Sequence, residues 1–561
     1  MRTLLLVLPA CALCSAAELV VDAGGSGQFT EIHAAMAAAQ SGDTILVQPG
    51  AYTIDRPLVF GGKNVILRAP GGPSETVIRM AATPLDIRDA SILIFRNGET
   101  ASAVVEGFAL TGGQGTFYNT DPLGKAGGAV LCYNGSSPTV RNCILSGNRA
   151  IMGGAICIDN SAPAFFDCTI EHNEVTYDGG ALFCYNNARA SFANCVFNEN
   201  RAGRHGGGIE LYIDCPLTFT DCAITRNRCA QLGGGITLDV NTSPRFTRCR
   251  IADNVSPQYG GGLLVFRGSS PRLDSCILAG NLAQTQSGGA LACDQSSSPV
   301  LDNCLVYGNR APSGGIAVCI NSCSPVFNHC TLAGNRSDTG THVLCLAATS
   351  QPRYNNSILC SNFPAGTFCG AQTTCVAGKD PRFTAAGSFN IESFASVEFG
   401  GATMLVPAFI VEEPDFHLQA DSPAIDAGSD VVKLGVDFDG ARRPYGAAPD
   451  AGAFEFTDAA PAVAVHVGDV NADATINIAD AIALLAHLFG GTGTDPACRA
   501  ACDVNNDGKL DIADSVRVLG YLFATQSMLG PDGAAILPGG TGCREYPAAA
   551  LALSCDVTCN P

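Results

Sequence analysis

The chain has 561 residues, of which 64 are Gly, 27 are Cys and none is Trp, and its formal net charge is −19. This length predicts several domains or one long repetitive domain, and an apolar content of 47% excludes global disorder. The acidic balance argues against nucleic acid as a partner, because binding to phosphate requires clustered Lys and Arg side chains.

The N-terminal residues have the pattern of a secretory signal. A basic start (MRT) precedes the apolar run LLLVLPACAL and a stretch of small residues that ends at Ala17. The pattern predicts a signal peptide over residues 1–17 and a secreted or extracellular protein, with attachment to a cell surface left open. Lipidation at Cys11 is the alternative, and Pro9 argues against it. No later segment approaches the ~20 consecutive apolar residues of a membrane span, so we expect no transmembrane segment.

One motif recurs through the middle of the chain with a period of 25–28 residues. It consists of Cys, any residue, an apolar residue, two further residues and Asn. Its cysteines are Cys143, Cys168, Cys195, Cys222, Cys249, Cys276, Cys304 and Cys330. Its asparagines are Asn148, Asn173, Asn200, Asn227, Asn254, Asn281, Asn309 and Asn335, and a ninth copy has Ser357 and Asn362. A period of this length indicates a solenoid.

Two kinds of solenoid compete for this pattern. The string from Val140 to Asn148 also matches the leucine-rich repeat template, in which the second half of each repeat is usually helical. Here that half opens with a glycine pair, as at Gly153, and Gly costs ~1 kcal/mol in a helix. It then alternates apolar and polar residues, which is strand periodicity. Two short strands per repeat, joined by turns, favour a mainly β fold of the parallel β-helix type.

Residues one period apart would then lie directly above one another. The Asn column is expected to form an inward ladder of side-chain amides at one bend, and the glycine pairs to supply positive φ at another. The motif cysteines and a second set are expected to line the core as two columns. The second set comprises Cys132, Cys157, Cys184, Cys293, Cys319 and Cys345. Whether the stacked cysteines remain thiols or form some disulfides stays open at this point.

Several segments resemble right-handed β-helix proteins of the pectin-lyase-like superfamily. VVDAGGSGQFTEIHAAMAAAQSGDTILVQPGAYTID resembles their opening, which implies a capping helix over about residues 29–40. The GGAI repeats resemble those of chlamydial polymorphic outer-membrane proteins, and DPRF, DFHLQADSPAIDAG and VDFDGARRPYGAAPDAGAFEF resemble the closing coils of bacterial secreted β-helix proteins. The resemblance implies a right-handed parallel β-helix over residues 18–456, with a cap at 18–60, regular repeats at about 100–362 and closing coils at 380–456.

After a linker at residues 457–466 the pattern changes to two related loops, DVNADATINIAD and DVNNDGKLDIAD, each followed by a helical pattern. Oxygen-bearing side chains alternate along each loop, which is how proteins wrap Ca²⁺. The loops therefore predict two Ca²⁺ sites in a small α-helical domain. Gly508 satisfies the sharp turn of the second loop, whereas Ala474 makes the first the weaker match. The predicted ligands are Asp469, Asn471, Asp473, Thr475, Asn477 and Asp480 in the first loop, and Asp503, Asn505, Asp507, Lys509, Asp511 and Asp514 in the second, with Thr475 and Lys509 contributing backbone oxygens.

These loops end in Asp rather than Glu, and no helical pattern precedes the first, so they resemble dockerin type I repeats. The resemblance implies a dockerin-like domain over residues 467–525 and makes a cohesin-like protein or a cell-surface component the candidate partner. In dockerins the residues before the last ligand help to select that partner; here they are Ile478, Ala479, Ile512 and Ala513. The Pro/Gly/Cys-rich tail at residues 526–561 resembles the C-termini of planctomycete secreted proteins and favours a local disulfide.

Evidence for catalysis in the sequence is weak. The signatures of pectin methylesterases and polygalacturonases are incomplete or absent, and the repeats contain little Lys. Asp178 and His205 precede glycine pairs on successive repeats, with Arg204 and Glu210 nearby, and form the candidate acid/base cluster. A solvated turn is the alternative interpretation of the same residues.

Two functions therefore remain. The first is a non-catalytic protein that binds glycan or protein surfaces and docks through its C-terminal domain. The second is a carbohydrate-active enzyme, a polysaccharide lyase or glycoside hydrolase, acting in polysaccharide catabolism. Tyr177, Tyr259 and Phe266 are the candidates for stacking on sugar rings.

Overall fold

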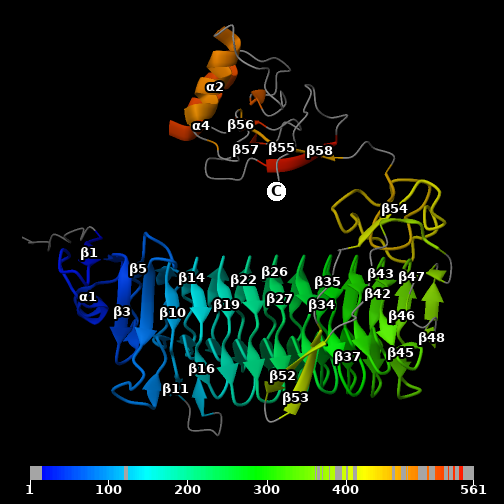
Figure 1. Cartoon of the computed structure of the whole chain (residues 1–561), viewed down its shortest axis with the longest axis horizontal. Helices are drawn as coiled ribbons and strands as arrows, with labels where there is room; N and C mark the ends of the chain where they lie inside the picture. The colour runs from blue at the N-terminus through cyan, green and yellow to red at the C-terminus, as the bar shows by residue number, and fades with distance from the viewer. Residues whose placement is uncertain are drawn as a thin grey trace, which may run out of the picture. The chain divides into compact units, whose positions relative to one another are not determined.

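The computed structural model divides the chain into two compact units, residues 1–456 and residues 457–561. Figure 1 shows the chain coloured from its N-terminus to its C-terminus. The structure describes residues 16–118, 124–360, 362, 367–368, 371–373, 375–377, 380–385, 394–399, 402–407, 414–457, 462–468, 470, 476, 478–489, 502–504, 512–523, 528–529, 535–536 and 543–547.

The first unit is a solenoid of parallel strands, which confirms the β-helix over the leucine-rich repeat. Its described strands form three long sheets of 14, 13 and 12 strands, which we call sheets A, B and C. Sheet A runs from β1 (Glu18–Val21) to β49 (Ala371–Thr373), sheet B from β3 (Gly50–Ile54) to β50 (Val376–Ala377), and sheet C from β4 (Leu58–Val59) to β48 (Thr367–Phe368). Between the two ends of the solenoid, each coil adds one strand to each sheet, so that the sheets run side by side along it (Figure 1).

One coil illustrates the arrangement. It begins with β22 (Ser191–Ala193) in sheet A and continues with β23 (Val196–Asn198) in sheet B. The two-residue strand β24 (Arg201–Ala202) follows in a fourth sheet of eight strands, and β25 (Ile209–Tyr212) completes the coil in sheet C. This coil thus has three principal strands and one short strand, and eight coils carry the short strand, so the expectation of two strands per repeat was wrong. The third principal strand is hidden in the sequence because the turn after β22 is only two residues long.

The N-terminal cap contains a helix as expected, although a shorter one. Helix α1 spans Ile32–Ala38, whereas the sequence predicted about residues 29–40. Ile32, Ala35 and Met36 are buried against the first coils. The helix closes the apolar interior at this end of the solenoid, which would otherwise be exposed to water.

The predicted asparagine ladder is confirmed. The Nδ2 group of each Asn donates to Oδ1 of the Asn one coil further on, at 2.9–3.1 Å, from Asn148 to Asn362. The same Oδ1 also accepts the backbone N–H of the preceding Asn, as between Asn200 and Asn227 at 3.0 Å. All of these side chains are buried. The ladder therefore satisfies the polar groups of one bend inside the protein, where water cannot reach them.

The glycine pairs form the turn that leads into sheet C. Gly206 has φ of +58°, in the left-handed region, and a Cβ there would lie 2.4 Å from the carbonyl oxygen of Ile209. A Cβ on the next residue, Gly207, would lie 2.1 Å from the carbonyl oxygen of Gly234 on the adjacent coil. Only Gly fits either position, so this turn is sharp and brings the residue before the pair next to sheet C.

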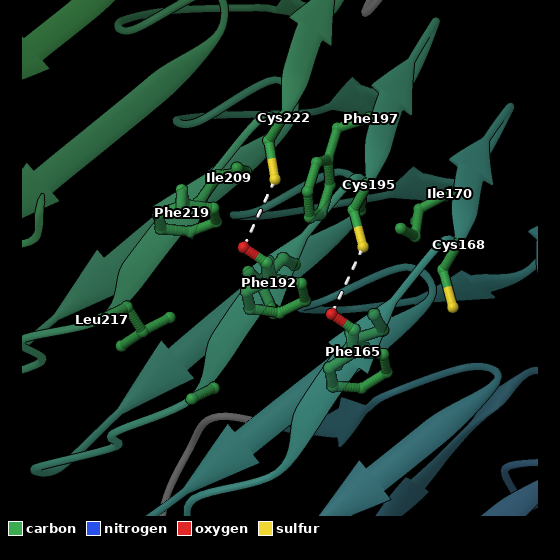
Figure 2. Packing of buried hydrophobic residues seen from close by; sticks show 14 of the residues in the cluster. Phe165, Cys168, Ile170, Phe192, Cys195, Phe197, Ile209, Leu217, Phe219 and Cys222 are labelled. Carbon is green, nitrogen blue, oxygen red and sulfur yellow. Dashed lines mark hydrogen bonds between the residues drawn. The ribbon is translucent and has the colours of Figure 1, made fainter. Parts of the chain in front are cut away.

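The interior of the solenoid is filled by stacked columns of side chains. Phe165, Phe192 and Phe219 stack at ring-centroid distances of 4.8 and 5.2 Å, with the motif cysteines beside them (Figure 2). The thiol of Cys195 donates to the carbonyl oxygen of Phe165 at 3.6 Å. The motif cysteines are buried thiols in hydrogen bonds of this kind, which confirms that this column lines the core.

The second cysteine column is only partly as predicted. Cys132 pairs with Ile158 and not with Cys157, and Cys184 occupies the same inward column. Cys157 lies one residue out of register, which places it on the opposite face of sheet C with Phe183. Since successive side chains of a strand alternate between faces, a one-residue difference in spacing moves a side chain out of the core. Cys345 is disulfide-bonded.

A closing segment, residues 414–456, packs on the last coils of sheet B. Phe416 and Phe454 are buried in a cluster with Tyr307 and Ile358. Beside them, Arg443 forms an ion pair of 2.8 Å with Glu455, and both side chains are at most 1% exposed. Arg443 also donates to Nδ1 of His329 at 2.7 Å. The segment is thus fixed to the solenoid by an apolar cluster and by a buried polar network.

In the part of the second unit that the structure describes, helices α2 (Ile478–Phe489) and α4 (Ile512–Phe523) contact each other. Leu484 of α2 is buried with Val470 and Cys502, and Val518 of α4 is also buried. Strands β55 (Ala462–His466) and β58 (Cys543–Pro547) pair antiparallel. The predicted signal peptide, apart from residues 16–17, and tail cysteines Cys555 and Cys559 lie outside the described residues.

Candidate functional site

Sheet C carries a column of side chains on the face opposite the core. Register places Val59, Ile94, Leu131, Cys157, Phe183, Glu210, Thr237, Leu264, Ala292, Val318 and Leu344 in this column. Its strands are β4, β8 (Leu93–Phe95), β13 (Val130–Cys132), β17 (Ile156–Asp159), β21 (Leu182–Tyr185), β25, β29 (Ile236–Asp239), β33 (Leu263–Val265), β37 (Leu291–Cys293), β41 (Ala317–Cys319) and β45 (Thr341–Cys345). The column is apolar except at Glu210 and Thr237, so these two residues mark a local change in the chemistry of the face.

Glu210 is 3% exposed, and its Oε2 atom is buried without a hydrogen-bond partner. Burial raises the pKa of Glu210 well above its ordinary value, and the nearby carboxylates of Asp178 and Asp239 raise it further. A buried carboxyl group without a cationic partner favours the protonated form because the charged form would lose its hydration.

The turn before each glycine pair places a second set of polar side chains beside sheet C. Asp178 and His205 occupy equivalent positions on adjacent coils, and the backbone N–H of His205 donates to Oδ1 of Asp178 at 3.0 Å. Arg204 forms a two-pronged ion pair with Asp178, with Nε at 3.0 Å from Oδ1 and Nη2 on Oδ2. The guanidinium of Arg204 also lies 5.2 Å from the ring centroid of Tyr177. Burial lowers the pKa of His205.

The next coils contribute three residues that the sequence analysis missed. Arg267 pairs with Asp239 through both ends of the carboxylate, with Nε at 2.6 Å from Oδ1. The same guanidinium lies 6.0 Å from the ring centroid of Tyr212. Tyr212 and Asp239 are aligned on adjacent strands of sheet C. Tyr212 and Asp239 could have been found from the constant 27-residue interval that separates Tyr185, Tyr212 and Asp239 in the sequence, whereas Arg267 lies outside this series.

Together these groups line a pocket of about 620 Å³ on sheet C, which we call the sheet C pocket. Its lining combines apolar and charged side chains. It is lined by Ile151, Met152, Tyr177, Asp178, Phe183, Arg204, His205, Glu210, Tyr212, Asp239 and Arg267. Of the aromatic residues predicted to stack on sugars, Tyr177 lines the pocket, whereas Tyr259 and Phe266 pack beside Leu264.

In the second unit, the two predicted loops have equivalent geometry where the structure describes them. Oδ1 of Asp480 accepts the backbone N–H of Val470 at 2.8 Å, and Oδ1 of Asp514 accepts that of Val504 at 3.0 Å. Asp480, Asp503 and Asp514 are all buried. Buried carboxylates at matching ends of two loops fit a cation, which would compensate the cost of burying their charge.

The other predicted ligands lie outside the described residues. These are Asp469, Asn471, Asp473, Thr475, Asn477, Asn505, Asp507, Lys509 and Asp511. No group of three His, Cys, Asp or Glu side chains converges on a metal position within the part of the chain that the structure describes.

Helices α2 and α4 each present apolar side chains to solvent. Ile478 and Ile482 on α2, and Ile512 and Val516 on α4, are all more than half exposed. The two pairs occupy equivalent positions, four residues apart on each helix. Ala513 is exposed as well, while the side chain of Ala479 lies outside the described residues. Ile478 and Ile512, two of the predicted partner-binding residues, therefore belong to a duplicated apolar surface.

The described helices include none that is long and apolar enough to span a membrane. Three overlapping stretches, residues 85–243, 128–286 and 231–377, match the family described as right handed beta helix region. Together they cover more than half of the chain, which therefore belongs to the right-handed β-helix family. Residues 467–523 match the dockerin type I domain, where α2 and α4 lie.

Several solved structures are similar to the chain at low identity. Pectate lyase Pel9A is 14% identical with a TM-score of 0.35, covering 80% of this chain and 98% of that one. The catalytic unit of the thermostable GH87 alpha-1,3-glucanase from Streptomyces thermodiastaticus strain HF3-3 is 15% identical with a TM-score of 0.28, covering 62% and 65%. The A-module of the mannuronan C-5 epimerase AlgE4 from Azotobacter vinelandii is 14% identical with a TM-score of 0.28, covering 62% and 91%. Similarity at this level carries no argument about activity.

No curated protein matches the chain. The two matched domains support a secreted, docking-capable β-helix protein. Dockerin type I domains generally bind calcium and imply a cohesin-like partner.

Proposed function

We propose that this protein is an extracellular glycan-binding β-helix that attaches to a larger assembly through its dockerin domain. One observation supports glycan binding. The apolar outer column of sheet C is interrupted only at Glu210 and Thr237, and Glu210 lines a pocket together with two Arg–Asp pairs and the exposed side chain of Tyr177. The predicted signal peptide is consistent with this location.

The chemistry of the sheet C pocket suits a sugar. A sugar ring has an apolar face of C–H groups and a rim of hydroxyl groups. Tyr177 and Phe183 provide an apolar wall for that face, and aromatic rings are well suited to such contacts. Arg204 and Asp178, held rigid by their mutual pairing, offer donors and acceptors to the hydroxyl groups.

Glycan binding is tested by titrating the full chain with a panel of neutral and acidic oligosaccharides. Tyr177→Ala is expected to weaken binding, and Tyr445→Ala is its matched control because both tyrosines are 51% exposed. Arg204→Met is likewise compared with Arg248→Met, since Arg248 forms the same two-pronged pair with Asp221 outside the pocket. Binding that neither pocket variant changes would refute the proposal.

Docking rests on the duplicated apolar surface and on calcium. Calcium, if bound there, would neutralise the carboxylates of the loops. The residues that would hold it are the twelve predicted ligands, one set for each of two sites, of which Asp480, Asp503 and Asp514 are buried as required. Ile478 and Ile512, together with Ile482 and Val516, would then contact a cohesin-like partner.

Docking is tested by measuring binding of the full chain to a panel of cohesin domains with calcium and with chelator. The double variant Ile478→Asp/Ile512→Asp is expected to lose binding, because it places one charge in the apolar surface of each of the two helices. Val431→Asp, also at an exposed apolar position but in the first unit, is expected to have no effect. Binding that persists in the double variant and in chelator would contradict this role.

A second function, catalysis by a polysaccharide lyase or glycoside hydrolase, is favoured by Glu210 alone. Its raised pKa makes it a candidate general acid, and Asp178 with His205 would be the other members of the cluster. Incubation with polysaccharides, followed by reducing ends and unsaturated-uronate absorbance, tests it. Turnover that Glu210→Gln abolishes would establish catalysis; glycan retention without turnover would exclude it.

A further inference from the structure

The ion pairs of the sheet C pocket determine how much charge the pocket presents to a ligand. Arg204 and Arg267 are the two permanent cations of the lining. Each already holds a carboxylate in a two-pronged pair: Arg204 with Asp178 and Arg267 with Asp239. A guanidinium engaged in this way has its charge matched, so it offers little attraction to a further anion.

The remaining titratable groups add no positive charge. The pKa of His205 is lowered by burial, which favours the neutral imidazole. Glu210 contributes either a neutral carboxylic acid or a negative charge. The lining therefore contains three carboxyl groups against two guanidinium groups, and its net charge is zero or negative in either state of Glu210.

Hydrogen-bonding capacity nevertheless remains. A guanidinium has five N–H donors, and the pair of Arg204 with Asp178 uses two of them. A carboxylate has about four acceptor positions, so Asp178 and Asp239 keep positions for hydroxyl donors. Oε2 of Glu210, buried without a partner, gains one if a ligand oxygen reaches the carboxyl group. Such donors and acceptors match hydroxyl groups, which are neutral and act as both.

An anionic sugar meets the opposite situation. The carboxylate of a uronate would lie beside Asp178, Asp239 and Glu210, or would have to displace one of these aspartates from its arginine. Either arrangement leaves a partly buried negative charge without a cation, which is costly. From this geometry we infer that the sheet C pocket selects uncharged sugar units and rejects uronates. The inference rests on the proposed glycan binding and specifies its substrate class.

Asp178 and Asp239 are the residues that exclude anions from the pocket, so neutralising either one should increase the affinity for anionic sugars. Asp239→Asn preserves the size of the side chain but leaves Arg267 with an unmatched positive charge inside the pocket. Asp178→Asn does the same for Arg204 and provides an independent variant. Asp221→Asn frees Arg248 outside the pocket and is the matched control for both.

The test is calorimetric titration of the full chain with neutral glucan, xylan and mannan oligosaccharides, with oligogalacturonate and oligomannuronate, and with cationic glucosamine oligomers. We expect a neutral oligosaccharide to bind at least about tenfold more tightly than either acidic one. Asp239→Asn or Asp178→Asn is expected to increase affinity for the acidic oligosaccharides by about tenfold, whereas Asp221→Asn leaves it unchanged.

The outcomes separate the inference from the proposed function. Acidic oligosaccharides that bind the unaltered chain as tightly as neutral ones would overturn the selectivity while leaving glycan binding in place. Preference for the glucosamine oligomers would also overturn it, since it would indicate an anionic pocket. If no oligosaccharide binds in a way that depends on Tyr177, glycan binding itself fails and the inference fails with it.

Discussion

Asn200 donates from its side-chain Nδ2 and from its backbone N–H to the same atom, Oδ1 of Asn227, at 3.0 Å in both cases. Asn227 repeats this contact with Asn254, so a single type of side chain carries a continuous hydrogen-bonded line through the solenoid. Each amide also donates to a backbone carbonyl of the previous coil, as Asn227 does to Phe197. Every coil is thereby linked to both of its neighbours at the same bend.

Replacing Asn227 by Ala should destabilise the protein strongly. The change leaves the N–H groups of Asn200 and the carbonyl oxygen of Phe197 buried without their partner. An unsatisfied buried polar group costs ~1–3 kcal/mol, so we expect the free energy of unfolding to fall by about 3 kcal/mol or more. Chemical denaturation measures it, with Asn198→Ala, on the outer side of the preceding coil, as the control. Equal losses in the two variants would refute the role of the ladder.

Replacing Arg443 by Met should release the closing segment from the solenoid. Removal of one partner of a buried ion pair costs ~3–5 kcal/mol, because Glu455 would be left as an unpaired buried charge. The neighbouring exposed residue provides the control variant Arg442→Met. Limited proteolysis should cut the Arg443→Met variant within residues 414–456 much faster than the control. Similar cleavage of both would show that the apolar cluster alone holds the segment.

The first unit should lose stability at alkaline pH through His417. Hydrogen bonds to Asp439 and Asp415 raise the pKa of His417 to about 9 from its ordinary value of 6.5. Because the folded pKa is raised, the contribution is fully present below pH 6.5 and is lost as pH rises through about 9. An NMR titration gives the pKa directly, and thermal unfolding of His417→Gln should lack this alkaline loss. A measured pKa near 6.5 would contradict the two ion pairs.

Glu210 should also make stability depend on pH, but as an acidic group that is neutral when protonated, unlike His417. Its raised pKa means that the folded state keeps the carboxyl neutral while the unfolded chain ionises above pH 4.5, so stability falls as pH rises above that value. Glu210→Gln removes the ionisation, so its stability relative to the original protein should increase as pH rises above 4.5. Glu174→Gln, at an exposed position, is the control. Parallel pH profiles of thermal unfolding for the original protein and Glu210→Gln would contradict the burial of this group.

Calcium removal should destabilise the second unit alone. A ligand that binds only the folded state stabilises it by about 2.7 kcal/mol at a hundred times its dissociation constant, so chelation should lower the unfolding temperature of this unit. Asp514→Ala should abolish one calcium-binding event in calorimetry, and Asp480→Ala the other. Ile482→Ser, at an exposed position on α2, should bind calcium as before. Unchanged stoichiometry in both aspartate variants would refute the two sites.

Periodicity in the sequence was sufficient to predict the solenoid, because every coil must repeat the same bends. The Asn ladder and the glycine turns were predictable for that reason: an amide can both donate to and accept from the coils next to it, and only Gly tolerates φ of +58° with a neighbouring carbonyl so close. Register was predictable only where the spacing was constant. Cys157 was misplaced because a difference of one residue reverses the face of a strand.

The sheet C pocket was only partly predictable. Asp178 and His205 share a position before a glycine pair, so their proximity could be inferred from the repeat. Arg267 and Asp239 pair between different positions of their coils, and no periodic signal relates them. The burial of Glu210 also depends on neighbours from several coils, which a linear pattern does not reveal.

All residues that line the sheet C pocket lie between Ile151 and Arg267, a minority of the coils of the solenoid. The coils outside this range have the same backbone hydrogen bonding but contribute no side chain to the pocket. Length and recognition are therefore independent properties of this molecule. Deleting one complete coil after Cys276 would shorten the rod by one strand spacing, ~4.8 Å, and leave the binding chemistry intact. The same architecture can thus act as a spacer of adjustable length that carries an unchanged pocket.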